Sequence, residues 1–299
     1  MLDAMVTVIL PVVIVAAVGA LLARRFRLDQ DTVGKISLYG FTPALAYTSL
    51  VKTTVSLGDG LALAGAYLAA TALTGALAAA AATGLDRPSR RGVIAATVLG
   101  NNGNFGLPIA LLALGAAGLD QAVILFVVSL VVMFTVGPAL LGSHRGPVGA
   151  LVSVLRLPVT WAMVAAVVVR ITGTQLPSGL STGIDLLAAA AIPLVLVSLG
   201  IQLGSAGRIH WTRAVLTATV ARVAVLPVLS LGVGAAMGLR GLPLQSLLLA
   251  QSMPTAVNAF MLAREYGTDT DNVAGVVALS TVISLGTIAF VVSILPRLA

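Results

Sequence analysis

Three asparagines stand close together in the apolar stretch 100–115, which reads GNNGNFGLPIALLALG. Asn101, Asn102 and Asn104, like the neighbouring glycines and Pro108, are poor helix formers, and a lipid bilayer offers no water to loose backbone groups. We therefore expect this stretch to unwind and to face protein or a water-filled cavity. The side-chain amides there could bind a polar group of a substrate.

A second polar cluster surrounds Pro254 in the apolar stretch 247–267, which reads LLLAQSMPTAVNAFMLAREYG. Asn258 follows its proline by four residues and Asn104 precedes its own by four, so the two amides would converge if the helices cross. Exposed amide donors and half-helix N-termini at such a crossing favour an anion such as a carboxylate. The candidate substrate-binding residues are Asn101, Asn102, Asn104, Pro108, Gln251, Pro254, Thr255 and Asn258.

Arg222 is the one charged residue deep inside a predicted membrane span. Burying an arginine costs ~2.5 kcal/mol or more on membrane-insertion scales, so a functional role is the default interpretation. It would supply positive potential for an anion or act as a counter-charge during transport. The alternative is that it snorkels to the interface or pairs with carbonyls beside Pro227.

Groups that would support catalysis are missing from the apolar stretches. There is no cysteine, and the ten acidic residues and two histidines fall in predicted loops or at span ends. The lack of cysteine excludes disulfides and thiolate sites. The sequence also contains no motif for intramembrane catalysis or metal binding and no phosphate-binding loop. We expect no enzyme, no cofactor and no metal, although backbone carbonyls at the broken helices could still bind sodium.

The composition requires a membrane. Of the 299 residues, 59% are hydrophobic and 9% are charged, against roughly a quarter charged in soluble domains. Apolar stretches of about 20 residues recur along the chain, which is the length that crosses a bilayer. The first follows Asp3 and precedes arginines, so we expect a retained span and not a signal peptide. The charge of +7 reflects loop orientation and not nucleic-acid binding.

Ten spans are predicted, and the basic residues support that number. The expected spans are 4–23, 34–52, 60–83, 92–115, 120–141, 157–171, 184–204, 212–236, 241–265 and 272–295. The loops on one side of the membrane would then carry twelve Lys and Arg residues, and the loops on the other side would carry four. Because loops rich in Lys and Arg stay in the cytoplasm, both termini are expected outside the cytoplasm. The membrane is expected to be the cell (inner) membrane.

The ten spans divide into two halves that would enter the membrane from opposite sides. The first five-span repeat is 1–141, a short cytoplasmic linker is 142–156, and the second, inverted repeat is 157–299. Pro43 and Pro193 fall in corresponding spans, as do Pro108 and Pro254, and each should kink or break its helix. Matching interruptions in inverted halves indicate a transporter's binding site, although each cluster alone could be an ordinary kink.

With these residues in view, the chain resembles the auxin efflux carrier family. The likeness rests on GNNGNFGLP, on AIPLVLVSLGIQL at 191–203 and on QSMPTAVNAFMLAREYG. The resemblance implies a scaffold domain of spans 1, 2, 6 and 7 and a transport domain of spans 3–5 and 8–10. It also implies elevator-type motion, with Asn104, Pro108, Pro254 and Asn258 at the helix crossing, and is compatible with a homodimer joined through the scaffold. The 142–156 linker is too short for the large hydrophilic loop of plant carriers, so a compact permease is expected.

The predicted function is transport of a small organic anion, a carboxylate such as malate or an auxin-like aromatic acid. A sodium-coupled organic-anion symporter of the bile-acid type remains open, since it shares the crossed-helix plan. A channel or a sensor on a transporter fold is the alternative from another class.

Overall fold

The computed structural model describes residues 2–26, 28–142, 146–204 and 211–298, and these residues are almost entirely helical. The first half contains α1 (Leu2–Ala4), η1 (Met5–Ile9), α2 (Leu10–Arg25), α3 (Gln30–Lys35), η2 (Ile36–Phe41), α4 (Thr42–Lys52), α5 (Leu57–Ala81), α6 (Arg87–Val98), η3 (Asn102–Gly106) and α7 (Leu107–Leu141). The second half contains α8 (Pro147–Leu155), α9 (Pro158–Thr172), α10 (Ser178–Gly204), α11 (Arg213–Val220), η4 (Ala221–Val225), α12 (Leu226–Ala236), α13 (Gly241–Gln251), α14 (Val257–Glu265), α15 (Thr270–Ile294) and η5 (Leu295–Leu298).

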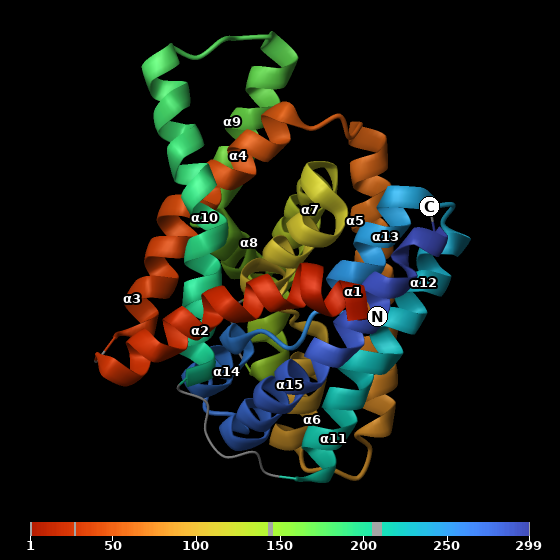
Figure 1. Ribbon diagram of the computed structural model, residues 1–299. Coiled ribbons are helices and arrows are strands. Elements are labelled where there is room, and N and C mark those ends of the chain that lie inside the picture. Colours follow the sequence, from red (N-terminus) through yellow and green to blue (C-terminus); the bar gives the residue numbers. More distant parts are fainter. Residues whose placement is uncertain (1, 27, 143–145, 205–210, 299) are drawn as a thin grey trace.

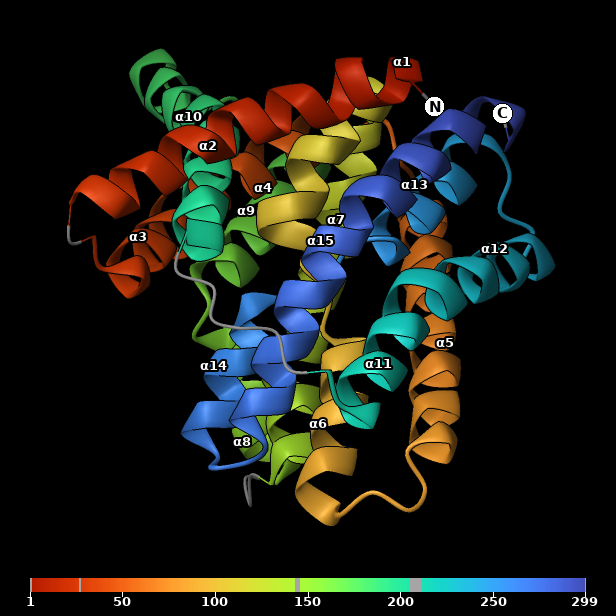
Figure 2. The same ribbon diagram turned by 60° about the horizontal axis from the view of Figure 1, so that its bottom comes forward.

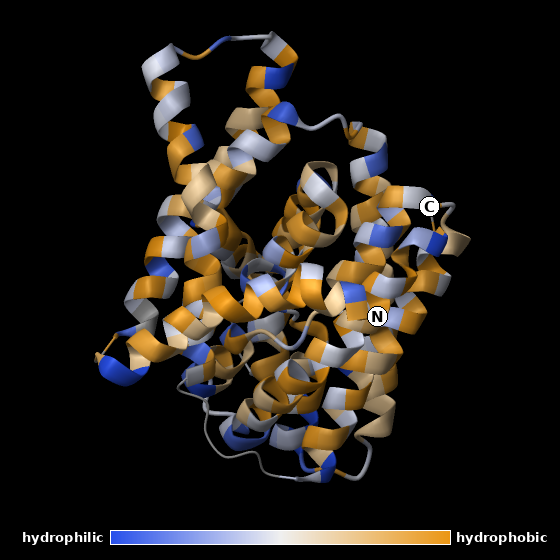
Figure 3. Cartoon of the chain, in the orientation of Figure 1, coloured by the Kyte–Doolittle hydropathy of each residue, from blue (hydrophilic) through white to orange (hydrophobic). Residues whose placement is uncertain are grey.

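Several helices can cross a membrane, which confirms a multi-pass helical membrane protein. In the described residues, 6 helices are long and apolar enough, or 7 if the bent pair α8 and α9, which meet at 71°, is one span. Hydrophobic residues run along these helices, and hydrophilic ones gather toward their ends (Figure 3). The ten expected spans are therefore not all long, continuous helices, because several are built from short segments.

The longest helical stretch contains a break at Gly115. Residues Asn102–Leu141 run for 40 residues, about twice what a bilayer needs. Gly115 has φ 69° and ψ −165°, a conformation that residues with a Cβ avoid, so α7 consists of two helices joined there. The sequence predicts a boundary between two spans at this place.

Four π-helical segments each end two residues before a proline. η1 precedes Pro11, η2 precedes Pro43, η3 precedes Pro108 and η4 precedes Pro227. A proline ring crowds the carbonyl one turn earlier and lacks an N–H, so widening the preceding turn relieves the clash. At Pro43 the chain therefore widens without coming apart.

Pro193 does not break its helix. It lies inside α10, which runs without interruption from Ser178 to Gly204. A helix can absorb a proline with the loss of one hydrogen bond, and Pro193 is exposed on the outside of the bundle, where nothing fixes a break. The break expected from the proline pattern is thus absent, and the two halves differ here.

The predicted linker contains a helix. Residues 147–155 of the expected 142–156 loop form α8, and residues 143–145 of that loop lie outside the described residues. The helix α8 turns sharply into α9. The run VGALVSVL is apolar, as a helix in a membrane requires, and its side chains Val148, Leu151, Val152 and Leu155 are exposed on the surface of the bundle.

The helices pack into two groups that meet across α7. On the left in Figure 1, α2 packs on α10, and α4 packs on α9 and α10. On the right and toward the bottom, α5 packs on α6 and α12, α12 on α13, and α11 on α6 and α15. Figure 2, which brings the bottom of the molecule forward, also separates α2 and α10 from α5, α11 and α12. The first group therefore comprises α2, α4, α9 and α10, and the second comprises α5, α6, α11, α12, α13 and α15.

Candidate functional site

Two interrupted helices pass one another at the centre of the candidate site. α6 ends at Val98 and is followed by an extended residue, Leu99. α13 ends at Gln251, and the chain is extended again at Ala256, just before α14. Gly100 and Thr255 form an antiparallel bridge. On either side of this bridge the Asn101 amide donates to the Pro254 carbonyl at 2.8 Å, and the Ala256 amide donates to the Leu99 carbonyl at 2.8 Å. The two clusters singled out from the sequence are therefore joined through their backbones.

The carbonyls at the end of α6 receive donors from the other half of the chain. A helix end leaves its last carbonyls without intrahelical partners, and a membrane interior supplies no water for them. The Thr255 hydroxyl donates to the Ala96 carbonyl at 2.7 Å, and Arg222 Nη1 donates to the Thr97 carbonyl at 3.0 Å. The break in α6 is thus compensated by contacts with the second half.

Arg222 lies behind this crossing, in the π-helical turn η4. Its side chain is fully buried, and Nε donates to the Met253 carbonyl at 2.7 Å. Arg222 therefore pairs with backbone carbonyls, which is one of the two interpretations drawn from the sequence. These carbonyls lie at the crossing and not beside Pro227. Among the described residues the ion pair is that of Lys52 with Asp185, so Arg222 has no carboxylate within 4.0 Å.

Helix α5 supports the crossing from a third side. Asn102 Nδ2 donates to the Tyr67 hydroxyl at 2.8 Å, and Gln251 Nε2 donates to the Tyr67 carbonyl at 3.0 Å and to the Thr71 hydroxyl at 2.9 Å. The sequence reasoning gave α5 no part in the site. A signal was available, because Tyr67, Thr71 and Thr74 form a polar stripe at helical spacing in an otherwise apolar span.

A cavity of about 310 Å³ opens beside the crossing. Three of the candidate asparagines line it, namely Asn101 and Asn104 from the first cluster and Asn258 from the second. Gly103 and Val257 line it as well, so the N-terminal ends of both second half-helices face the same space. Residues of both clusters thus line one cavity.

The other candidate residues build the crossing and do not line the cavity. They are all buried, and they are Asn102, Pro108, Gln251, Pro254 and Thr255. Asn102 Nδ2, Gln251 Nε2 and the Thr255 hydroxyl donate to protein groups, whereas Asn102 Oδ1 and Gln251 Oε1 are buried without a hydrogen-bond partner. Which residues line the cavity depends on the face of the helix to which each side chain points, and neighbouring residues point to different faces.

Several residues that line the cavity were not among the candidates named from the sequence. These are Lys35, Ser37 and Thr42 near the start of α4, Gln202 in α10, Phe126 and Ser129 in α7, and Glu265 in α14. Lys35 and Glu265 are the charged residues among those that line it, and both are exposed. One wall therefore belongs to the α2, α4, α9 and α10 group and the other to the crossing.

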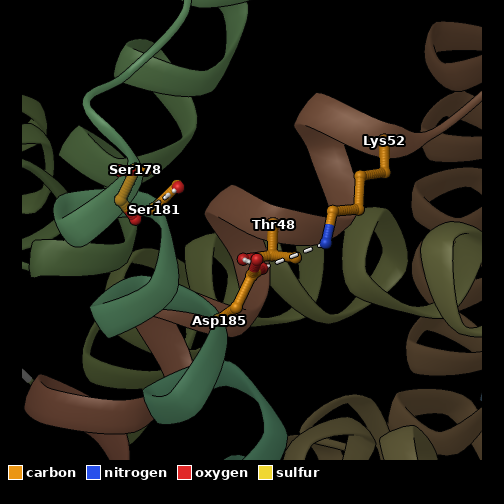
Figure 4. Close-up of polar contacts among 5 residues, drawn as sticks. All are labelled: Thr48, Lys52, Ser178, Ser181 and Asp185. Atoms are coloured by element: carbon orange, nitrogen blue, oxygen red, sulfur yellow. Dashed lines mark hydrogen bonds and ion pairs between the residues drawn. The ribbon is translucent and has the colours of Figure 1, made fainter.

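A second cavity of about 270 Å³ lies between α4, α9 and α10. Lys52 Nζ and Asp185 Oδ1 are 3.0 Å apart at its edge, and Figure 4 shows Thr48 beside them. The side chains of the pair are 64% and 51% exposed, and such pairs contribute at most about 1 kcal/mol. This cavity lacks the interrupted backbone of the first.

Comparison with known proteins identifies a family of transporters. Residues 148–292 match the family described as membrane transport protein. The chain is therefore similar to this family of transporters over just under half of its length. The resemblance drawn from the motifs is thereby confirmed, as is the prediction of a transporter and not an enzyme.

Relatives of this transporter share its length and a modest identity. An uncharacterized transporter of Methanothermobacter thermautotrophicus is 28% identical over 86% of this chain and 86% of its own. A transporter of Rhizobium meliloti, whose name proposes malonate as its substrate, is 28% identical over 63% of this chain and 62% of its own. An uncharacterized transporter of Methanocaldococcus jannaschii is 26% identical over 66% of each chain.

Proposed function

We propose that this protein is a secondary transporter of a small organic anion, which binds in the cavity beside the helix crossing. The observation that supports this most directly is that Asn101, Asn104, Val257 and Asn258 all line one cavity. The first amides of a helix lack intrahelical acceptors and lie at the positive end of its dipole. An anion is the ligand that such amides stabilise best.

The cavity's size limits the class of substrate. About 310 Å³ lies at the small end of the roughly 300–1,000 Å³ usual for ligand pockets. A short dicarboxylate such as malonate or malate fits this range with room for water, and an aromatic acid such as indole-3-acetate would fill more of it. The name of the Rhizobium meliloti relative favours testing malonate first.

Movement of one helix group against the other would provide alternating access. The cavity is lined by Thr42 and Gln202 from one group and by Asn101 and Asn258 from the other. Sliding one group along the other would change which side of the membrane this space meets. We propose ten spans in two inverted five-span repeats, 1–141 and 157–299, with both termini outside the cytoplasm and elevator-type motion of the crossing-containing group.

The test uses purified protein in liposomes on a solid-supported membrane. Malonate, malate and indole-3-acetate are applied in turn, with malonamide as the uncharged control of nearly equal size. The wild type is compared with an Asn104→Ala, Asn258→Ala pair and with Asn272→Ala, an asparagine that bonds to Asp269 outside the cavity. We expect a saturable signal for at least one acid, none for malonamide, and loss of the signal only in the cavity pair.

The other outcomes identify the alternatives. A signal that requires a sodium gradient would favour the sodium-coupled symporter, and currents far above carrier turnover would favour a channel. An equal response of the wild type and the cavity pair would contradict the proposed site. Absence of a response to all acids by folded wild type would contradict the anion preference and leave the sensor interpretation.

A further inference from the structure

The carbonyl ends of broken membrane helices are where transporters commonly hold a coupling cation. In this protein the carbonyl of Thr97 lies in the last turn of α6, and the carbonyl of Met253 lies two residues beyond the end of α13. Both accept hydrogen bonds from one guanidinium, that of Arg222, at 3.0 Å and 2.7 Å. The position that a bound cation would take is therefore occupied by a positive side chain of the protein.

Gly100 separates this guanidinium from the cavity. A Cβ built on Gly100 would lie 2.0 Å from Arg222 Nη2 and 2.7 Å from Cζ, so the guanidinium packs directly against the Gly100 backbone. Gly100 itself lines the cavity. The charge of Arg222 is thus one backbone thickness away from the space where the substrate would bind.

The charge of Arg222 is not cancelled by a carboxylate within the described residues. The Arg222 side chain is fully buried, and Nη2 has no hydrogen-bond partner. Carbonyl dipoles offset the positive charge in part, and the low dielectric of the membrane interior lets the remainder act over several ångströms. An anion in the cavity is the counter-charge that this arrangement lacks.

We propose that Arg222 is a built-in cation that replaces a bound alkali cation at the crossing, so that the site holds its shape and attracts its anion without sodium. The inference rests on the proposed anion transport, which it deepens by specifying sodium independence. Arg222 is a positioning residue here, because it acts through Thr97, Met253 and Gly100 and does not touch the cavity.

The experiment compares wild type, Arg222→Lys and Arg222→Gln in sodium, potassium and N-methyl-D-glucamine chlorides of equal ionic strength. Arg213→Gln is the matched control, since this exposed arginine of the same span also donates to two backbone carbonyls, those of Ala81 and Thr83. Melting temperature is measured without substrate, and malonate-evoked charge movement is measured in liposomes. The melting arm tests the inference even if malonate is not transported.

We expect the wild type and Arg213→Gln to melt and to transport alike in all three salts. Arg222→Lys keeps its charge and should retain sodium-free transport, whereas Arg222→Gln should raise the KM for malonate by about tenfold or more without sodium. Sodium that raises the wild-type melting temperature or malonate current would overturn the proposal, as would an Arg222→Gln variant equal to the wild type without sodium. If Arg222→Gln does not fold, the sodium response of the wild type alone decides.

Discussion

The main-chain amide of Asn101 donates a 2.8 Å hydrogen bond to the main-chain carbonyl of Pro254. These residues belong to different halves of the chain, and each lies where a membrane helix has come apart. The bond, repeated between Ala256 and Leu99 at 2.8 Å, lets each break satisfy the other. A broken helix in lipid would otherwise expose groups that cost several kcal/mol each. The crossing is therefore a single unit that neither half could form alone.

Substitution of Gly100 tests how tightly this unit is packed. Gly100→Ala should destabilise the protein by about 1–3 kcal/mol, because the new Cβ collides with the Arg222 guanidinium. The measurement is the melting temperature in detergent. Gly232→Ala is the control, since no atom lies within 4 Å of a Cβ at that helical position. Equal melting temperatures for the two variants would show that Arg222 moves aside without cost.

Removal of the Thr255 hydroxyl tests the capping of α6. Thr255→Val keeps the side-chain volume and removes the donor to the Ala96 carbonyl, which should cost about 1–3 kcal/mol because the carbonyl is then unpaired. Thr172→Val removes a hydroxyl that bonds to its own exposed helix and should change little. Thermal unfolding of both variants provides the comparison, and a similar loss in each would argue against a special role for the crossing.

Two glycines set the packing of α2 on α10. A Cβ on Gly200 would lie 1.8 Å from the Ala16 carbonyl oxygen, and one on Gly19 would lie 2.1 Å from that of Val197. Gly200→Ala should therefore force the two helices apart and reduce the yield of folded protein. Gly183→Ala on the same helix meets nothing within 4 Å and should be tolerated. Size-exclusion profiles and melting curves check this, and a folded Gly200→Ala protein of normal stability would refute it.

The absence of cysteine makes the proposed orientation easy to test. Gln175→Cys places a thiol in the loop between α9 and α10, and Thr83→Cys places one between α5 and α6. A membrane-impermeant maleimide should label Gln175→Cys in intact cells and Thr83→Cys only after permeabilisation. The reverse labelling pattern would invert the proposed topology, and labelling of both positions in intact cells would contradict the number of spans between them.

Much of the site could be recognised before the fold was known. Helix-breaking asparagines, glycines and prolines inside apolar stretches identify the two interruptions, because backbone preferences are local. Asn101, Asn104 and Asn258 then prove to line one cavity. The same local reasoning failed at Pro193, because whether a proline breaks a helix depends on what packs around it.

The sequence by itself determined that this protein is embedded in a membrane, where its helices are interrupted and which family of transporters it resembles. Hydropathy and chain stiffness are properties of neighbouring residues, so the order of residues is sufficient to reveal them. Only the tertiary structure decided that Tyr67 and Arg222 support the crossing and that Lys35 and Gln202 line the cavity. Those roles depend on which helix faces meet, and the rotation and packing of distant helices are not written in any local stretch.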